Sequence, residues 1–199
     1  MRIIHVGASG TIGSSVKSEL EKRHEIISVG STSGDIQMDM VDAASIRAMY
    51  EKAGGFDALV CTAGHAHFGP FDEMKEEHFY KGIKGKMMGQ INLVMIGKEF
   101  INAGGSFTLT TGVTHNEPIK NGLGLSFING ALHSFVMAAA IELKNGIRIN
   151  AVSPGLVEKS KEALGSYFPG QIPVSMERVA QGFVKSVEGF GTGKVIEIL

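Results

Sequence analysis

Three glycines spaced three residues apart, Gly7, Gly10 and Gly13, constrain the fold of this chain more than any other feature. An apolar run from Ile3 to Val6 precedes them and has the length of a buried parallel strand, and residues 14–23 after them have a helical pattern. In such a unit the glycines permit a tight turn, close approach of a pyrophosphate to the backbone, and close packing of the helix on the sheet. Glycines also occur in turns that bind nothing, but the flanking strand and helix favour a dinucleotide-binding loop.

The rest of the chain alternates segments with strand and helix patterns. Strands are expected at residues 25–29, 35–39, 56–61, 106–111, 147–152 and 194–198, and helices at residues 43–52, 71–100, 125–143 and 176–187. This alternation predicts an α/β fold, a single Rossmann-like domain over residues 1–199 with a doubly wound parallel sheet and helices on both faces. The second and third strands are so close that either the connecting helix is reduced to a loop or the third strand pairs unusually.

Local signals set further expectations for the helices and loops. Asp42 is a good N-cap for the helix that follows it. The helical stretch at residues 71–100 contains Gly82 and Gly85, either of which can break it. Residues 156–175 lack clear periodicity, so we expect a mobile flap over the cleft.

Composition narrows the classes of partner. The net charge is −1 with no basic stripe, which disfavours nucleic acid and anionic membranes. The single cysteine, Cys61, ends an apolar run and is expected to be a buried hydrophobic residue rather than a nucleophile. His65 and His67 have the spacing of two metal ligands, but no further ligand cluster supports a metal site. No leader and no apolar stretch of bilayer-spanning length is evident, so we expect a cytoplasmic protein.

The end of the second strand bears on the choice of cofactor. This strand ends in Gly30-Ser31-Thr32-Ser33, where a carboxylate would bind the ribose 2′-hydroxyl of NAD. Ser31 and Thr32 offer hydroxyls in place of an acid, so the segment favours NADP over NAD, although no Arg or Lys is present there to pair with a 2′-phosphate. Gly64, just past the fourth strand, also suits a cofactor lying over the sheet edge.

Several segments together resemble the short-chain dehydrogenase/reductase family. Residues 7–13 are similar to its nucleotide loop, although the spacing is GxxGxxG rather than the common GxxxGxG. Asp39 resembles the family's acidic residue near the adenine, and residues 61–64, Cys-Thr-Ala-Gly, resemble its Asn-Asn-Ala-Gly segment. Residues 147–155 are close to the family's sequence before the nicotinamide contact. The predicted cofactor contacts are Gly7, Ser9, Gly10, Thr11, Ile12, Gly13, Ser31, Thr32, Asp39, Thr62, Ala63, Gly64, Pro154, Gly155 and Val157.

The family's catalytic positions are occupied by different residues. The family uses Tyr-x-x-x-Lys on the long helix after the fifth strand, with a serine at the end of that strand and an asparagine on the preceding helix. Alignment puts Ser126 at the tyrosine and Gly130 at the lysine. Thr111 falls near the serine and Lys86 near the asparagine. The literal Tyr80–Lys84 pair precedes the fifth strand, so we treat its spacing as a coincidence.

Proton transfer therefore needs another donor. A serine hydroxyl is far less acidic than a phenol, which makes Ser126 a poor general acid. Other polar residues lie in or near the expected cleft, and each is also a plausible surface or helix-face residue: Lys86, His115, Asn116, Lys120 and His133. The predicted catalytic residues are Thr111, Ser126, Lys86 and His115.

Two functions remain open from the sequence. The first is an NAD(P)-dependent oxidoreductase that acts on a small carbonyl or alcohol substrate, because hydride transfer needs only the nicotinamide and an oriented substrate. The alternative is a catalytically impaired NAD(P)-binding sensor or regulatory protein. A purely structural subunit is disfavoured because it would leave the glycine loop without a role. The resemblance also implies a homodimer or homotetramer, built through residues 89–100 and 125–143.

Overall fold

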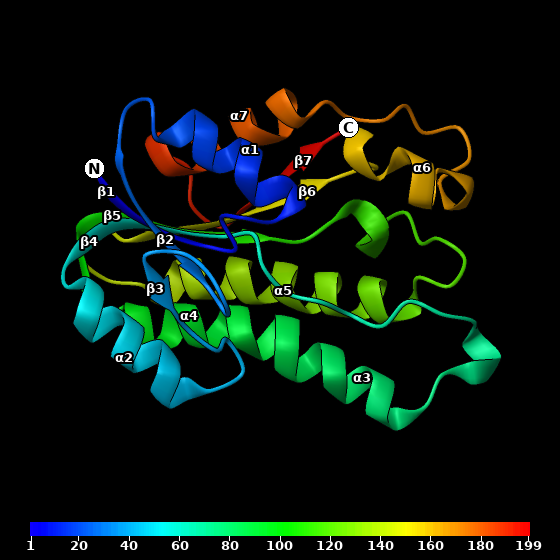
Figure 1. Cartoon of the computed structure of the whole chain (residues 1–199), viewed down its shortest axis with the longest axis horizontal. Coiled ribbons are helices and arrows are strands. Elements are labelled where there is room, and N and C mark those ends of the chain that lie inside the picture. Colours follow the sequence, from blue (N-terminus) through cyan, green and yellow to red (C-terminus); the bar gives the residue numbers. More distant parts are fainter.

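The sheet is the centre of the fold, and the computed structural model describes every residue from Met1 to Leu199 around it (Figure 1). Its seven strands are all parallel and lie in the order β3-β2-β1-β4-β5-β6-β7. This order reverses direction beside β1, which confirms the doubly wound α/β fold. The strands are β1 (Arg2–Val6), β2 (Glu25–Gly30), β3 (Ile36–Gln37), β4 (Phe56–Cys61), β5 (Ile101–Thr110), β6 (Arg148–Pro154) and β7 (Lys194–Ile198).

Helices cover both faces of this sheet, as Figure 1 shows. One face carries α1 (Thr11–Leu20) and α7 (Met176–Glu188), which bury an apolar cluster that includes Ile3, Val60 and Phe183. The other face carries α2 (Ala43–Ala53), α4 (Gly89–Gly97) and α5 (Leu123–Glu142) over a larger apolar cluster. The shorter helices are α3 (Glu76–Gly82) and α6 (Lys161–Leu164).

The connection between β2 and β3 is a loop. Val29 pairs with Ile36 in parallel register, so the crossover helix expected between two such strands is reduced to a short turn. The Asp35 carboxylate accepts hydrogen bonds from the Ser28 backbone at 2.8 Å and the Ser28 hydroxyl at 2.6 Å. Gly34 adopts φ +104°, where a side chain would be strained. These contacts fold the loop back on β2 and decide between the two alternatives left open by the sequence.

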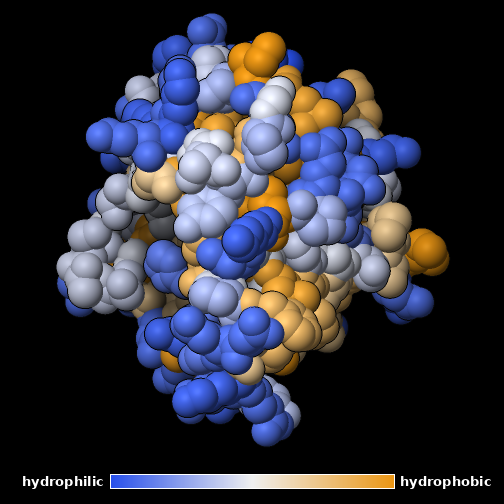
Figure 2. All heavy atoms as spheres, turned by 90° about the vertical axis from the view of Figure 1, so that its right-hand side faces the viewer, coloured by the Kyte–Doolittle hydropathy of each residue, from blue (hydrophilic) through white to orange (hydrophobic).

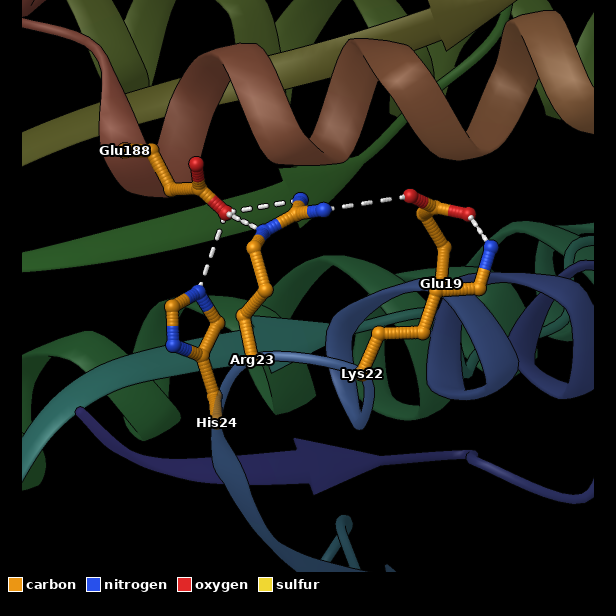
Figure 3. A network of polar contacts seen from close by, with 5 residues as sticks. All are labelled: Glu19, Lys22, Arg23, His24 and Glu188. Atoms are coloured by element: carbon orange, nitrogen blue, oxygen red, sulfur yellow. Dashed lines mark hydrogen bonds and ion pairs between the residues drawn. The ribbon is translucent and has the colours of Figure 1, made fainter.

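A polar cluster fastens the ends of α1 and α7 to each other (Figure 3). Glu188, at the end of α7, accepts hydrogen bonds from Arg23 at 2.9 Å and from His24 at 3.0 Å. Arg23 also reaches Glu19 on α1, at 3.5 Å. The contacts are partly exposed, so their effect is to align the two helices more than to add stability.

Two segments of the helical layer differ from the sequence expectations. The stretch at 71–100 does not break at Gly82 or Gly85, because a π-helical segment, Ile83–Met88, joins α3 to α4. Residues 156–167 contain α6 between two short 3₁₀ turns, where no periodicity was expected, while residues 168–175 are irregular. Asp42 does cap α2, accepting a hydrogen bond from the Ala44 amide at 2.9 Å.

Helix α5 corrects a further expectation. By length and composition alone it is apolar enough to cross a membrane, although the sequence analysis expected no such stretch. A soluble protein's core helix meets the same criterion, and Ile128, Leu132 and Val136 of α5 are buried in the core beneath the sheet. The apolar composition of α5 is therefore accounted for in part by its packing against β6.

Candidate cofactor and substrate site

The glycine loop between β1 and α1 has the geometry of a phosphate cradle. Gly7 adopts φ +84°, and its amide donates a hydrogen bond to the Val29 carbonyl at 2.8 Å. A Cβ on Gly13 would overlap the Gly7 carbonyl oxygen, so only glycine allows α1 to approach β1 this closely. Gly10 is exposed at the start of the helix. Gly7 and Gly13 therefore have the roles that the spacing predicted, and the approach of a pyrophosphate to Gly10 stays a prediction.

The first turn of α1 leaves its amides free. No side chain caps the helix, and the amides of Thr11, Ile12 and Gly13 donate to no group of the protein. Thr11 is exposed, as is Ser9 before it. Unpaired amides at a helix N-terminus attract anions. The residues present therefore fit a dinucleotide diphosphate.

The end of β4 forms a second wall beside this loop. The Thr62 hydroxyl donates to the Gly7 carbonyl at 3.0 Å and lies 3.0 Å from Nε2 of the buried His5. A Cβ on Gly7 would come within 2.9 Å of Ala63. Gly64 adopts φ +125° and packs against the Lys86 side chain. Thr62, Ala63 and Gly64 thus shape and adjoin the glycine loop, while the Thr62 hydroxyl is already bonded within the protein.

The other predicted cofactor residues lie mostly along the same edge of the sheet, because the carboxyl ends of parallel strands meet there. Ser31 and Thr32 are exposed after β2. Asp39 is exposed after β3 and accepts a hydrogen bond from the Val41 amide at 3.0 Å. Pro154 ends β6, and the Gly155 amide next to it donates to the Ile198 carbonyl. Val157 differs, since its side chain packs in the apolar cluster under α1 and α7.

Lys86 is buried and makes a specific contact with α5. It lies in the π-helical segment with 7% of its surface exposed, and its Nζ donates to Asn129 Oδ1 at 2.9 Å. The Asn129 amide nitrogen in turn donates to the Thr114 hydroxyl at 2.9 Å. Burial lowers the pKa of the Lys86 amine to about 8. The structure thus places the Lys86 amine, which comes from the π-helical segment, beside Asn129, the residue before Gly130 on α5.

Thr111, at the end of β5, contacts a histidine that the predicted catalytic set left out. Its hydroxyl lies 2.6 Å from Nε2 of His133 on α5, and both residues are buried. Burial, together with the nearby His115 and Lys86, lowers the pKa of His133 to about 4. His115 packs edge-on against His133, with ring centroids 3.9 Å apart, so it reaches Thr111 only through His133.

A sequence signal for His133 was available. Asn129 and His133 are four residues apart on α5, so they share one helix face.

Gln90 was missed altogether. It is fully buried, and its amide donates to the Thr110 carbonyl at 3.0 Å and accepts from the Thr110 amide at 3.1 Å. Gln90 thereby satisfies both backbone groups of Thr110, the last residue of β5.

Ser126 lines a cavity. Figure 2 shows the end of the molecule that lies at the right of Figure 1, where hydrophobic and hydrophilic side chains lie side by side on the surface. The Ser126 hydroxyl is buried and has no hydrogen-bond partner. The cavity has a volume of about 750 Å³ and is open to solvent. Its lining combines apolar side chains with a few polar ones: Pro70, Phe71, Asp72, Pro118, Ile119, Lys120, Asn121, Leu123 and Ser126. The cavity is large enough for a small organic molecule.

The remaining residues that the sequence analysis considered for catalysis or metal binding are exposed, buried in the core or packed against another ring. Tyr80 is half exposed on α3. Cys61 is fully buried, and burial raises the pKa of its thiol to about 12, which confirms that it is a hydrophobic core residue. His67 stacks on His78 with ring centroids 3.9 Å apart. No group of three or more His, Cys, Asp or Glu side chains is arranged to hold a metal ion.

The sequence of this chain is similar to those of known oxidoreductases. Residues 9–182 match the family model described as enoyl-(acyl carrier protein) reductase. Glucose 1-dehydrogenase of Gluconobacter oxydans is 32% identical over 139 residues, which cover 66% of this chain and 49% of that protein. An uncharacterized oxidoreductase of Methylorubrum extorquens is 28% identical over 137 residues, covering 66% of this chain and 55% of that protein. The chain spans about half the length of these curated relatives.

Solved structures cover the chain completely. The protein lin1944 from Listeria innocua is 45% identical, with a TM-score of 0.98 and complete coverage of both chains. A small-chain dehydrogenase in complex with NADPH is 24% identical, with a TM-score of 0.88 over all of this chain and 96% of that chain. At that identity the second likeness shows the fold alone.

Proposed function

Because this chain belongs to the short-chain dehydrogenase/reductase family, we propose that it is an NAD(P)-dependent oxidoreductase acting on a small carbonyl or alcohol. The observation that carries the proposal is the set of free amides at Thr11, Ile12 and Gly13 above a glycine turn. A diphosphate bound there would lead the rest of the dinucleotide along the carboxyl edge of the sheet. Bound NADPH would supply a hydride at its nicotinamide ring.

NADP is the proposed cofactor in preference to NAD. The acid nearest to the end of β2, Asp35, is bonded to Ser28, so it is not free to bind a ribose 2′-hydroxyl. Ser31 and Thr32 are exposed there and would donate hydroxyl hydrogen bonds to a 2′-phosphate. The small-chain dehydrogenase of similar fold was solved with NADPH, which is consistent with this choice.

The proposed catalytic site differs from the family pattern. Ser126 and Thr111 would orient the substrate oxygen, and the unpartnered Ser126 hydroxyl beside the cavity supports this role. Lys86 would replace the family's lysine from the opposite helix, since its amine contacts Asn129 next to Gly130. The amine is protonated below its pKa of about 8, so it would act as a buried cation beside the site at neutral pH. His115 would act behind these groups, because its ring contacts His133.

One observation favours the alternative, a dinucleotide-binding sensor without turnover. Ser126 and Gly130 stand where the family has tyrosine and lysine, so no phenol is available as the proton donor. A sensor would bind the cofactor on the same glycine loop and leave the cavity beside Ser126 without a reacting substrate.

A turnover assay separates the two functions. Purified protein is mixed with NADPH or NADH and a panel of aldehydes, ketones and quinones, and the absorbance of the reduced cofactor is followed. Oxidation of the cofactor that depends on one substrate class supports the oxidoreductase. Tight cofactor binding without turnover on any substrate would support the sensor and overturn the proposed activity.

We also propose that the chain forms a homo-oligomer through α4 and α5. Along α5, Leu123, Phe127, Met137 and Ile141 form an exposed apolar stripe at helical spacing. Met95 on α4 is also apolar, and 47% of its surface is exposed. An exposed apolar stripe of this kind is typical of a surface that a partner covers.

A further inference from the structure

We propose that His5 is a positioning residue for the dinucleotide and that it acts through the Thr62 hydroxyl on the carbonyl of Gly7. The inference rests on the proposed oxidoreductase function and adds to it the groups that hold the glycine loop in its binding form. His5 lies in β1 and Thr62 directly follows β4, and these two strands are neighbours in the sheet.

The Thr62 hydroxyl lies between the glycine loop and the first turn of α1. Its oxygen is 3.0 Å from the Gly7 carbonyl oxygen and 3.2 Å from the Val6 carbonyl oxygen. It would be only 2.8 Å from a Cβ on Gly13, so it also adjoins the start of α1. The Thr62 amide donates to the Val6 carbonyl at 2.9 Å, which fixes the backbone that carries the hydroxyl.

The Gly7 carbonyl is the group that this hydroxyl holds. It accepts hydrogen bonds from the Thr62 hydroxyl and from the Gly10 amide, the latter at 3.0 Å. Gly7 adopts φ +84°, and a glycine peptide has little steric resistance to reorientation. A carbonyl oxygen turned toward a bound diphosphate would set negative charge against negative charge. The two donors on the Gly7 oxygen therefore keep that oxygen away from the anion.

His5 completes this arrangement because the threonine hydroxyl has only one hydrogen. When Thr62 gives that hydrogen to Gly7, the N–H of the contact with His5 must come from Nε2, which lies 3.0 Å from the hydroxyl. In the opposite tautomer Thr62 would donate to Nε2, and Gly7 would lose its second donor. That tautomer would also bury an N–H at Nδ1, which has no hydrogen-bond partner. An unpaired buried donor is costly, so the proton belongs on Nε2.

The surroundings of His5 keep its ring neutral. The residue is fully buried, and burial together with the charge of Lys17 lowers its pKa to about 3. A neutral imidazole carries a single ring proton, and here that proton is committed to Thr62. The donor to Thr62 therefore stays in place throughout the physiological pH range.

The affinity of matched variants for NADPH and NADH tests the inference. Thr62→Val keeps the shape of the side chain without its hydroxyl, and we expect the preferred coenzyme to bind roughly five- to tenfold more weakly in calorimetry. His5→Leu, which removes the donor to Thr62, should weaken binding severalfold. Thr62→Ser keeps the hydroxyl and should bind within about twofold of the wild type.

Thr108→Val is the matched control for lost stability. It removes another buried threonine hydroxyl, one that lies 2.7 Å from the Ser186 hydroxyl on α7, and it should leave the coenzyme affinity unchanged. Binding by the wild type that Thr62→Val and His5→Leu retain in full would overturn the inference alone. No heat from the wild type with either coenzyme would overturn the proposed function, and the inference with it.

A second measurement needs no bound coenzyme. In ¹⁵N-labelled wild-type protein, NMR reports which ring nitrogen of His5 carries the proton, and we expect Nε2. The Gly10 amide, which donates to the Gly7 carbonyl, should exchange with solvent severalfold faster in Thr62→Val than in the wild type or Thr108→Val. A proton on Nδ1 of His5, or Gly10 exchange that Thr62→Val leaves unchanged, would overturn the inference even in an active oxidoreductase.

Discussion

Lys86 Nζ and Asn129 Oδ1, 2.9 Å apart, join the π-helical segment to the long helix α5 inside the protein. The amine thereby lies next to Gly130, the position at which the family resemblance led us to expect a lysine. Lys86 of the π-helical segment thus approaches the position at which the family has a lysine on the long helix. The contact is also costly, because a buried amine loses its hydration and regains only one hydrogen bond.

Lys86 should make stability rise with pH in the alkaline range. Its folded pKa of about 8 lies below the ordinary value of 10.5, so the unfolded chain binds more protons between these values. The free energy of unfolding should therefore gain up to about 3 kcal/mol from this group as the pH rises through that window. Chemical denaturation of wild type and Lys86→Met at several pH values measures this gain. Subtracting one pH profile from the other removes the pH dependence that Cys61 and Tyr50 contribute to both proteins. The exposed Lys81→Met is the control, and identical profiles for all three proteins would contradict the prediction.

His5 should make the protein sensitive to acid. It is fully buried beside Thr62, and desolvation lowers its pKa from 6.5 to about 3. Because the folded value is the lower one, the unfolded chain takes up the proton first, and stability falls as the pH drops below 6.5. The loss amounts to about 5 kcal/mol by pH 3. In His5→Val the loss of unfolding free energy between pH 7 and pH 4 should be smaller by about 3 kcal/mol, as measured by denaturant titration across that range. An unchanged acid slope would show that His5 carries a proton in the folded state.

Cofactor preference should respond to one residue after β2. Ser31→Asp places a carboxylate where the ribose 2′ position is expected, which would repel a 2′-phosphate and accept a 2′-hydroxyl. NADPH should bind at least about tenfold more weakly and NADH more tightly, as measured by calorimetry. Ser18→Asp adds the same charge to the exposed side of α1 and should leave both affinities unchanged. Equal losses for both coenzymes in Ser31→Asp would contradict the assignment.

The apolar stripe on α5 should hold subunits together. Met137 is 52% exposed in the middle of this stripe, so Met137→Glu would place a charge in the buried part of the interface. Sedimentation should show a dimer or tetramer for the wild type and a smaller species for the variant. Val41→Glu, at a 57% exposed residue outside α5, is the control and should sediment as the wild type does. A monomeric wild type would contradict the prediction.

The sequence predicted those features that depend on a few neighbouring residues. The glycine loop needs only positive φ at Gly7 and the absence of a side chain at Gly13, and both requirements can be seen in the spacing. The Asp42 cap is equally local, because its carboxylate reaches an amide only two residues away.

Features that depend on how helices dock were not predictable in the same way. The Thr111–His133 contact joins residues 22 apart and exists only because α5 packs beside the end of β5. The π-helical segment has no distinct composition, so Gly82 and Gly85 suggested a break where the helix widens. The bounds predicted for α5 lie within two residues of the observed ones, and what the sequence analysis missed is that the buried and exposed faces of that helix are both hydrophobic.

Calorimetry with NADPH and NADH on wild type and Gly10→Asp tests the central claim most directly. The account predicts saturable heat with at least one coenzyme, because the free amides of α1 bind the diphosphate. It also predicts loss of that heat in Gly10→Asp, whose carboxylate would meet the phosphates, with a circular dichroism spectrum like that of the wild type. No heat with either coenzyme, or full binding by Gly10→Asp, would contradict it.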